Sequence, residues 1–228
     1  MSHAGPPPGR HPLHNPDAGQ HPLPEDPREI DAVLQATRRC YAEHPYFMAR
    51  YGERGLAFTN SDGGWLVVLS TAWQSHVHEQ VSWLCDLLAA RGMPSWLMEV
   101  HLMLLHQALR ERLPGQALRF ARLRRAATRL RQQRCARMAQ ADFDAIAEHF
   151  QAQAGPDLAN AGRLIVAAVC DERGGRDQAV PSLLKWLADP GRFPARWCCA
   201  VNEALVQARA TPMPAPSRAR PVRPGRRA

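Results

Sequence analysis

Apolar residues recur along most of the chain at the three- and four-residue spacing of an amphipathic helix. Stripes of this kind begin at Ile30, Val77, Leu97, Phe143, Leu158 and Trp197. Residues at this spacing fall on one face of an α-helix, so each stripe predicts a helix with one buried side. The expected fold class is therefore all-α.

Prolines mark the ends of these stripes. Seven of them lie between residues 28 and 210, each where one helical pattern stops or the next begins: Pro45, Pro94, Pro114, Pro156, Pro181, Pro190 and Pro194. Proline is accepted in the first turn of a helix and breaks its interior. Because connections such as RGMP and RLPG are short, neighbouring helices must turn back on each other. The chain is predicted to form antiparallel helical hairpins in a multi-helix bundle.

Both ends of the chain lack this periodicity. Residues 1–27 are rich in proline and histidine, and residues 211–228 in proline and arginine. Segments that bury little apolar surface do not offset the entropy lost on ordering, so both are predicted to be disordered tails. The expected organisation is a tail over 1–27, a single helical domain over 28–210 and a tail over 211–228.

Two segments about a hundred residues apart share an order of landmarks. Trp83, Leu84, Asp86, Gly92, Pro94, Trp96 and Val100 run in the same sequence as Trp186, Leu187, Asp189, Gly191, Pro194, Trp197 and Val201. An internal duplication and a chance likeness of two helical hairpins both explain this order. Under duplication, Trp96 and Trp197 are expected to be buried in equivalent settings.

The net charge of +8 is concentrated in two blocks. The stretch 119–137 holds eight arginines and no acid, and the C-terminal tail holds five more arginines. At about 100° per residue, Arg122, Arg125 and Arg129 share one helix face. The C-terminal half of the stretch is expected to be hard to bury.

The arginine stretch has two interpretations. It forms either a docking face for an acidic protein or non-specific nucleic acid, or a solvated face whose arginines pair with Asp142, Asp144 and Glu148. The docking face, extended by the C-terminal tail, gives the first functional hypothesis, which is a non-enzymatic interaction or regulatory protein that binds an acidic macromolecule.

A glycine-rich stretch, residues 46–65, separates two helical patterns. It lacks the G-K-[ST] and G-x-G-x-x-G elements of phosphate-binding loops, so it is interpreted as a connector with Ser61 or Asp62 capping the next helix. The alternative is a ligand pocket, because aromatic and charged residues crowd together here. The candidates for that pocket are Arg50, Tyr51, Glu53 and Arg54.

His101 lies among leucine and methionine residues, a setting suited to the edge of a haem. It joins the pocket candidates in the second functional hypothesis, a helical sensor or carrier for haem or another planar anionic ligand. No pair of histidines in the predicted helical domain has the i, i+3 or i, i+4 spacing of a helical metal site, so no metal is expected. The serines and cysteines show no nucleophile motif, so no catalytic residue is expected.

The chain has no apolar run of membrane-spanning length, which favours a cytoplasmic location with six reduced cysteines. The sequence does not define the oligomeric state.

Overall fold

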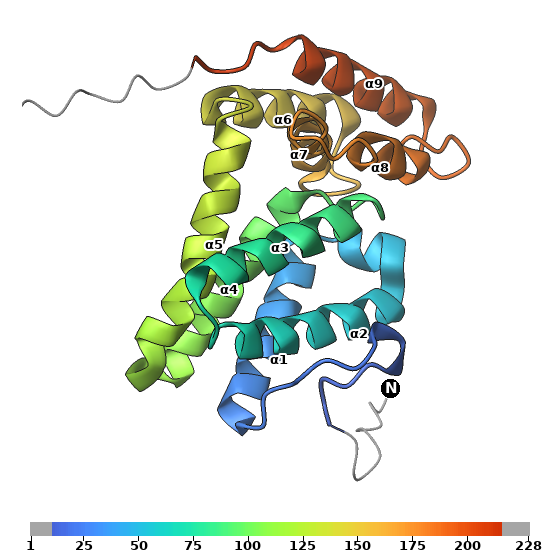
Figure 1. Ribbon diagram of the computed structural model, residues 1–228. Coiled ribbons are helices and arrows are strands. Elements are labelled where there is room, and N and C mark those ends of the chain that lie inside the picture. The colour runs from blue at the N-terminus through green and yellow to red at the C-terminus, as the bar shows by residue number, and fades with distance from the viewer. Residues whose placement is uncertain (1–10, 216–228) are drawn as a thin grey trace, which may run out of the picture.

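The computed structural model describes residues 11–215, and within them the chain forms α-helices and 3-10 turns and no strand (Figure 1). The predicted all-α class is confirmed. The helices are α1 (Pro27–Glu43), α2 (Tyr46–Leu69), α3 (Gln74–Ala89), α4 (Ser95–Arg112), α5 (Ala117–Cys135), α6 (Gln140–Ala154), α7 (Ala161–Glu172), α8 (Ala179–Leu187) and α9 (Ala195–Ala210). The 3-10 turns are η1 (Pro16–Ala18) and η2 (Pro114–Gln116).

Helix starts follow the expected chemistry. At α1 the side chain of Asp26 accepts a hydrogen bond from the Arg28 amide, and Pro27 occupies the first turn. Pro94 and Pro194 directly precede α4 and α9. Since proline has a fixed φ and no amide hydrogen to leave unpaired, it suits these positions.

The helices pack into two groups, α1–α5 and α6–α9, which lie in the lower and upper parts of Figure 1. In the first group α4 packs along α1 and α5, and in the second α6 packs along α7 and α9. Helix α5 runs from the lower group towards α6. Buried leucines and phenylalanines such as Leu105, Phe120 and Phe150 fill the interior. The bundle predicted from the hairpin connections is therefore present.

A buried polar network joins the two groups. Asp171 of α7 accepts hydrogen bonds from the backbone amide of Ser95 (2.7 Å) and from its hydroxyl (2.6 Å), at the start of α4. Arg176 lies 3.2 Å from Asp171 and 2.7 Å from Asp86 of α3. The carboxylate of Asp171 thus accepts hydrogen bonds at the start of α4. It also pairs with Arg176, which in turn pairs with Asp86 of α3.

Helix α2 corrects the connector prediction. Gly52, with φ 57° and ψ −154°, is the point at which the helix kinks, but Ser61 and Asp62 lie inside the helix beyond it and cap nothing. Gly63 and Gly64 allow close packing there. A Cβ atom on Gly63 would lie 2.8 Å from Val33, and one on Gly64 would lie 2.8 Å from Leu23.

The N-terminal segment, residues 11–26, is packed on α2, so the prediction of a disordered tail over 1–27 is wrong for this part. Leu13 is 1% exposed, the ring of His11 contacts the Pro24 carbonyl oxygen at 2.9 Å, and His21 contacts the Ser61 carbonyl oxygen at 3.2 Å. The expectations for residues 1–10 and for the arginines of 216–228 lie outside the described residues.

Trp96 and Trp197 are both buried, at 6% and 0% exposure, as predicted. Their settings differ. Trp197 stacks on Phe193, and its indole N–H donates to the Leu187 carbonyl oxygen at 2.9 Å. Trp96 instead packs edge-on against His44. The internal duplication stays a prediction. Between residues 11 and 215, no helix is both long enough and apolar enough to cross a bilayer.

Candidate functional site

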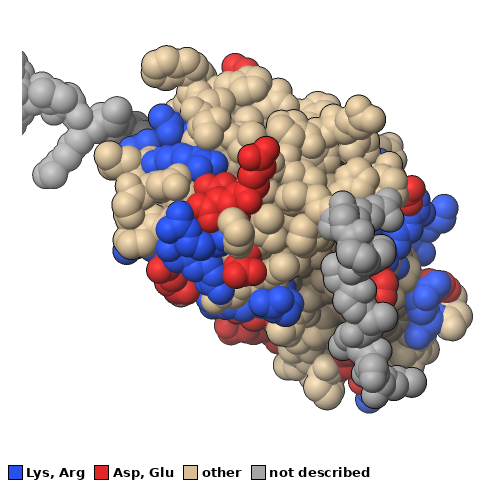
Figure 2. Space-filling view, turned by 90° about the horizontal axis from the view of Figure 1, so that it is seen from below, with Lys and Arg blue, Asp and Glu red and all other residues tan. Residues whose placement is uncertain are grey.

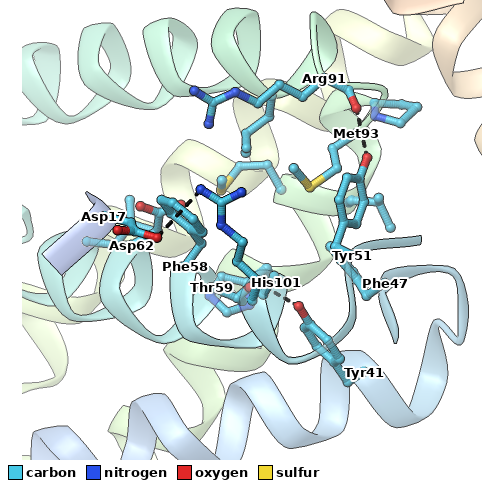
Figure 3. Close-up of a pocket in the computed structure, with 17 residues that line it drawn as sticks. Asp17, Tyr41, Phe47, Tyr51, Phe58, Thr59, Asp62, Arg91, Met93 and His101 are labelled. Atoms are coloured by element: carbon cyan, nitrogen blue, oxygen red, sulfur yellow. Dashed lines mark hydrogen bonds and ion pairs between the residues drawn. The ribbon is translucent and has the colours of Figure 1, made fainter. Parts of the chain in front are cut away.

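A cavity of about 410 Å³ lies between α2 and the start of α4 (Figure 3). Its walls come from η1, α1, α2, the end of α3, the α3–α4 turn and α4. The lining residues are Asp17, Tyr41, Phe47, Tyr51, Arg54, Gly55, Phe58, Thr59, Asp62, Leu66, Leu88, Arg91, Met93, Pro94, Leu97, Met98 and His101. Small-molecule sites in proteins have this volume and this mixture of apolar walls with a few polar groups.

The aromatic walls are held in place by contacts between the residues that line the cavity. Tyr41 and Phe47 stack with their ring centroids 5.0 Å apart, and the Tyr41 hydroxyl lies 3.3 Å from the Thr59 hydroxyl. Tyr51 donates a hydrogen bond from its hydroxyl to the Arg91 carbonyl oxygen at 2.8 Å, which ties α2 to the α3–α4 turn. The cavity therefore has positioned rings on two sides.

His101 of α4 is 5% exposed, and neither of its ring nitrogens has a hydrogen-bond partner within the described residues. Burial lowers the pKa of His101 to about 4, so the imidazole is neutral at pH 7. A neutral imidazole carries one donor and one acceptor. Leaving both without a partner in the interior is costly, and native proteins rarely do so. His101 thus lines the cavity as a buried imidazole whose two ring nitrogens are unsatisfied, and its Nε2 faces Gly63 of α2.

The mouth of the cavity is charged. Arg54, whose side chain is 77% exposed, lies 3.5 Å from Asp17 of η1. Asp62 lines the same cavity, and Arg91 projects from the α3–α4 turn (Figure 3). Burial raises the pKa of Asp62 to about 6, although the nearby charges of His21 and Arg91 act in the opposite direction. Two basic and two acidic side chains therefore surround the opening.

Three of the five predicted pocket residues line this cavity, namely Tyr51, Arg54 and His101. Arg50 does not, because its side chain is held by contacts with Tyr46 and with α8. Its guanidinium donates to the Tyr46 hydroxyl at 2.6 Å and to the Ser182 carbonyl oxygen at 2.8 Å.

Glu53 is exposed and also lies outside the lining. Sequence reasoning misses Asp62, which the glycine-rich pattern assigns to a helix cap, and Arg91, which sits in the RGMP connection and carries no signal of its own.

Helix α5 presents the predicted arginine face in part. Arg125 and Arg129 are exposed, whereas Arg122 is half-buried and donates to the Ser70 carbonyl oxygen at 3.2 Å. Trp73 is 81% exposed and precedes Gln74, whose side chain donates to the Arg122 carbonyl oxygen at 3.2 Å. The exposed Trp73 is therefore the sequence neighbour of a residue that contacts the helix carrying the arginine face.

Other arginines of α5 are structural. Arg134 is 5% exposed and donates to both carboxylate oxygens of Glu99, at 3.1 and 3.2 Å. Arg119 pairs with Glu29 at 2.5 Å. The expectation that the C-terminal half of the stretch is hard to bury is therefore wrong for Arg134. The acidic partners of Arg134 and Arg119 lie in α4 and α1, whereas the predicted partners are the acids that follow α5.

Of those predicted acids, Asp144 pairs with Arg163 of α7 at 3.1 Å. On the face seen in Figure 2, basic and acidic side chains are intermixed in two groups, one at each side, and a broad neutral area separates the two groups.

Within residues 11–215, no cluster of three or more His, Cys, Asp or Glu side chains is arranged to hold a metal ion. No known protein family, curated protein or solved structure matches this chain.

Proposed function

We propose that this protein is a carrier or sensor for a small, largely apolar molecule that binds in the cavity between α2 and α4. The observation that carries the proposal is a cavity of about 410 Å³ lined by His101, a neutral buried imidazole whose two ring nitrogens have no hydrogen-bond partner in the described residues. A ligand that hydrogen-bonds to this ring would satisfy groups that the described part of the chain leaves unsatisfied.

The rest of the lining favours an apolar body. The rings of Tyr41, Phe47, Tyr51 and Phe58 and the side chains of the α3–α4 region surround the space. Aromatic faces bind flat or aliphatic groups by burial and by ring contacts. Contacts with the apolar walls would therefore provide most of the affinity for the ligand, and a hydrogen bond to His101 would orient it.

The proposal is tested with N-phenyl-1-naphthylamine, an uncharged dye that becomes fluorescent in apolar sites. We expect saturable binding to the wild type, and an affinity at least about ten-fold lower in Thr59→Trp, because the indole would occupy the cavity. The matched control is Thr128→Trp. Both threonines donate a hydrogen bond to the carbonyl oxygen four residues earlier in their helix, but Thr128 is on the exposed side of α5. Equal dye affinity in the two variants would contradict the proposal.

Haem is one member of this ligand class. A neutral imidazole nitrogen is a suitable axial ligand for iron, although Nε2 of His101 faces α2, 3.5 Å from the position of a Cβ on Gly63. A Soret band on addition of haemin, absent in His101→Leu but present in His106→Leu, would identify haem as the ligand. His106 is the control because it is buried in the same helix and does not line the cavity.

The exposed indole of Trp73 supports a second function, which is binding of single-stranded nucleic acid along α5. Arg125 and Arg129 of α5 are exposed, and bases stack on aromatic rings while arginines bind the phosphates. Two partners are expected for this helix, an acidic protein and nucleic acid. Nucleic acid fits the exposed indole better, because its bases can stack on the ring.

Replacing Arg122, Arg125 and Arg129 with glutamine should change stability by well under ~1 kcal/mol each, since these side chains interact only at exposed or half-exposed positions. Binding of an oligothymidylate should weaken, and the slope of log K against log salt should shrink by about 0.7 for each phosphate that the protein no longer neutralises. The measurement is a salt titration of binding with the wild type, the triple variant and Trp73→Ala. Unchanged binding in both variants would exclude this function.

A further inference from the structure

We propose that the ligand carries one anionic group, which Arg54 and Arg91 bind at the mouth of the cavity after Asp17 of the N-terminal segment gives up Arg54. The inference rests on the proposed function, because it names the class of molecule that enters the same cavity. It also gives the segment 11–26 a role, since Asp17 would occupy the position of the ligand's charge while the cavity is empty.

Arg54 is suited to exchange its partner. Its guanidinium is highly exposed, lies 5.7 Å from the centre of the Phe58 ring, and meets Asp17 through one contact of 3.5 Å. Exposed ion pairs of this kind contribute about 0–1 kcal/mol, so a ligand anion loses little by displacing Asp17. Phe58 places the arginine directly over the apolar lining.

Arg91 supplies a second positive charge on another side of the opening. No carboxylate in residues 11–215 lies within ion-pair distance of it. Its backbone carbonyl is fixed by the Tyr51 hydroxyl, which holds the turn that carries it (Figure 3). A planar guanidinium binds a carboxylate or sulfonate through two parallel hydrogen bonds, so Arg91 has unused capacity for an anion.

Asp62 determines how this site depends on pH. The charges of His21 in the N-terminal segment and Arg91 in the α3–α4 turn act on it, and Asp17, Arg54 and His101 line the same cavity. As the pH falls through about 6, Asp62 takes up a proton and the mouth loses one negative charge. Binding of an anion should therefore strengthen over this range, whereas binding of an ammonium ion should weaken.

The experiment compares two dyes with the same ring system, 1-anilinonaphthalene-8-sulfonate and the uncharged N-phenyl-1-naphthylamine. We expect Arg54→Gln and Arg91→Gln each to reduce affinity for the sulfonate by about five-fold and to leave affinity for the uncharged dye within about two-fold, since a surface ion pair contributes up to about 1 kcal/mol. Arg38→Gln, on the exposed face of α1 and outside the lining, should affect neither dye. Asp17→Asn should increase affinity for the sulfonate.

A second arm measures affinity for the sulfonate at pH 5 and pH 7.5 in the wild type and in Asp62→Asn, with circular dichroism to show that the fold is intact. The wild type should bind more tightly at pH 5, and Asp62→Asn should lose most of this difference. If the uncharged dye binds and the arginine variants bind the sulfonate normally, the anion inference is wrong and the proposed function stands. Binding of the sulfonate that weakens as pH falls would also overturn the inference. If neither dye binds, the proposed function fails first.

Discussion

Replacing Trp197 with alanine is expected to lower the free energy of unfolding by about 3–5 kcal/mol, as for other large buried aromatic residues. The indole is fully buried, stacks on Phe193 with the centroids 4.8 Å apart, and meets Phe150 edge-on. Its N–H also satisfies the carbonyl oxygen of Leu187 near the end of α8. Alanine would leave a cavity between α6, α8 and α9 and an unpaired carbonyl. Urea denaturation followed by far-UV circular dichroism measures the loss of stability.

Two variants serve as controls for Trp197→Ala. Trp197→Phe keeps a ring in the cluster and loses the hydrogen bond, so it should cost less than alanine. Trp83→Ala removes an indole that is 56% exposed. It should lower the free energy of unfolding by only a fraction of the loss caused by Trp197→Ala. Similar losses for Trp83→Ala and Trp197→Ala would show that the cluster around Trp197 is not a main source of stability.

Asp171→Ala is expected to destabilise the protein by about 3–5 kcal/mol, because removing one partner of a buried ion pair leaves the other charge without compensation. Arg176, whose side chain is 10% exposed, would keep only Asp86, and the amide and hydroxyl of Ser95 would lose their acceptor at the start of α4. Thermal denaturation of the variant and the wild type at pH 7 measures the effect.

The matched control is Asp157→Ala. Asp157 pairs with Arg196 at 3.7 Å, both side chains are about half exposed, and such pairs contribute about 0–1 kcal/mol. A loss at Asp171 no larger than the loss at Asp157 would mean that the network between α4 and α7 contributes specificity of packing and little stability.

The helices are predictable because their signals are local. Apolar stripes repeat at helical spacing. Prolines such as Pro94 and Pro194 directly precede a helix, where a residue without an amide hydrogen breaks no helical hydrogen bond. The kink in α2 is less predictable. Gly52 adopts a positive φ at the kink between the two helical parts of α2, whereas Gly63 and Gly64 allow close packing, and the sequence does not distinguish these uses of glycine.

The cavity is predictable only in part, because its walls meet through tertiary packing. Tyr51 and Arg54 are close in sequence and line the same cavity, but the side chain of Arg50 turns to α8. Arg91 and Asp62 belong to different segments and have no motif that connects them. The burial of Arg134 has the same cause, since its partner Glu99 is thirty-five residues away.

The order of residues 11–26 bears on how the chain is divided for experiments. Composition places the start of the folded part at residue 28, yet Leu13 and Leu23 cover Gly64 of α2, and Asp17 reaches Arg54. A fragment beginning at residue 28 would expose this glycine face and its apolar surroundings to water, and exposed apolar patches promote association of chains. Aggregation of such a fragment would then result from the loss of residues 11–27, which cover α2, and would not show that the helices are unstable.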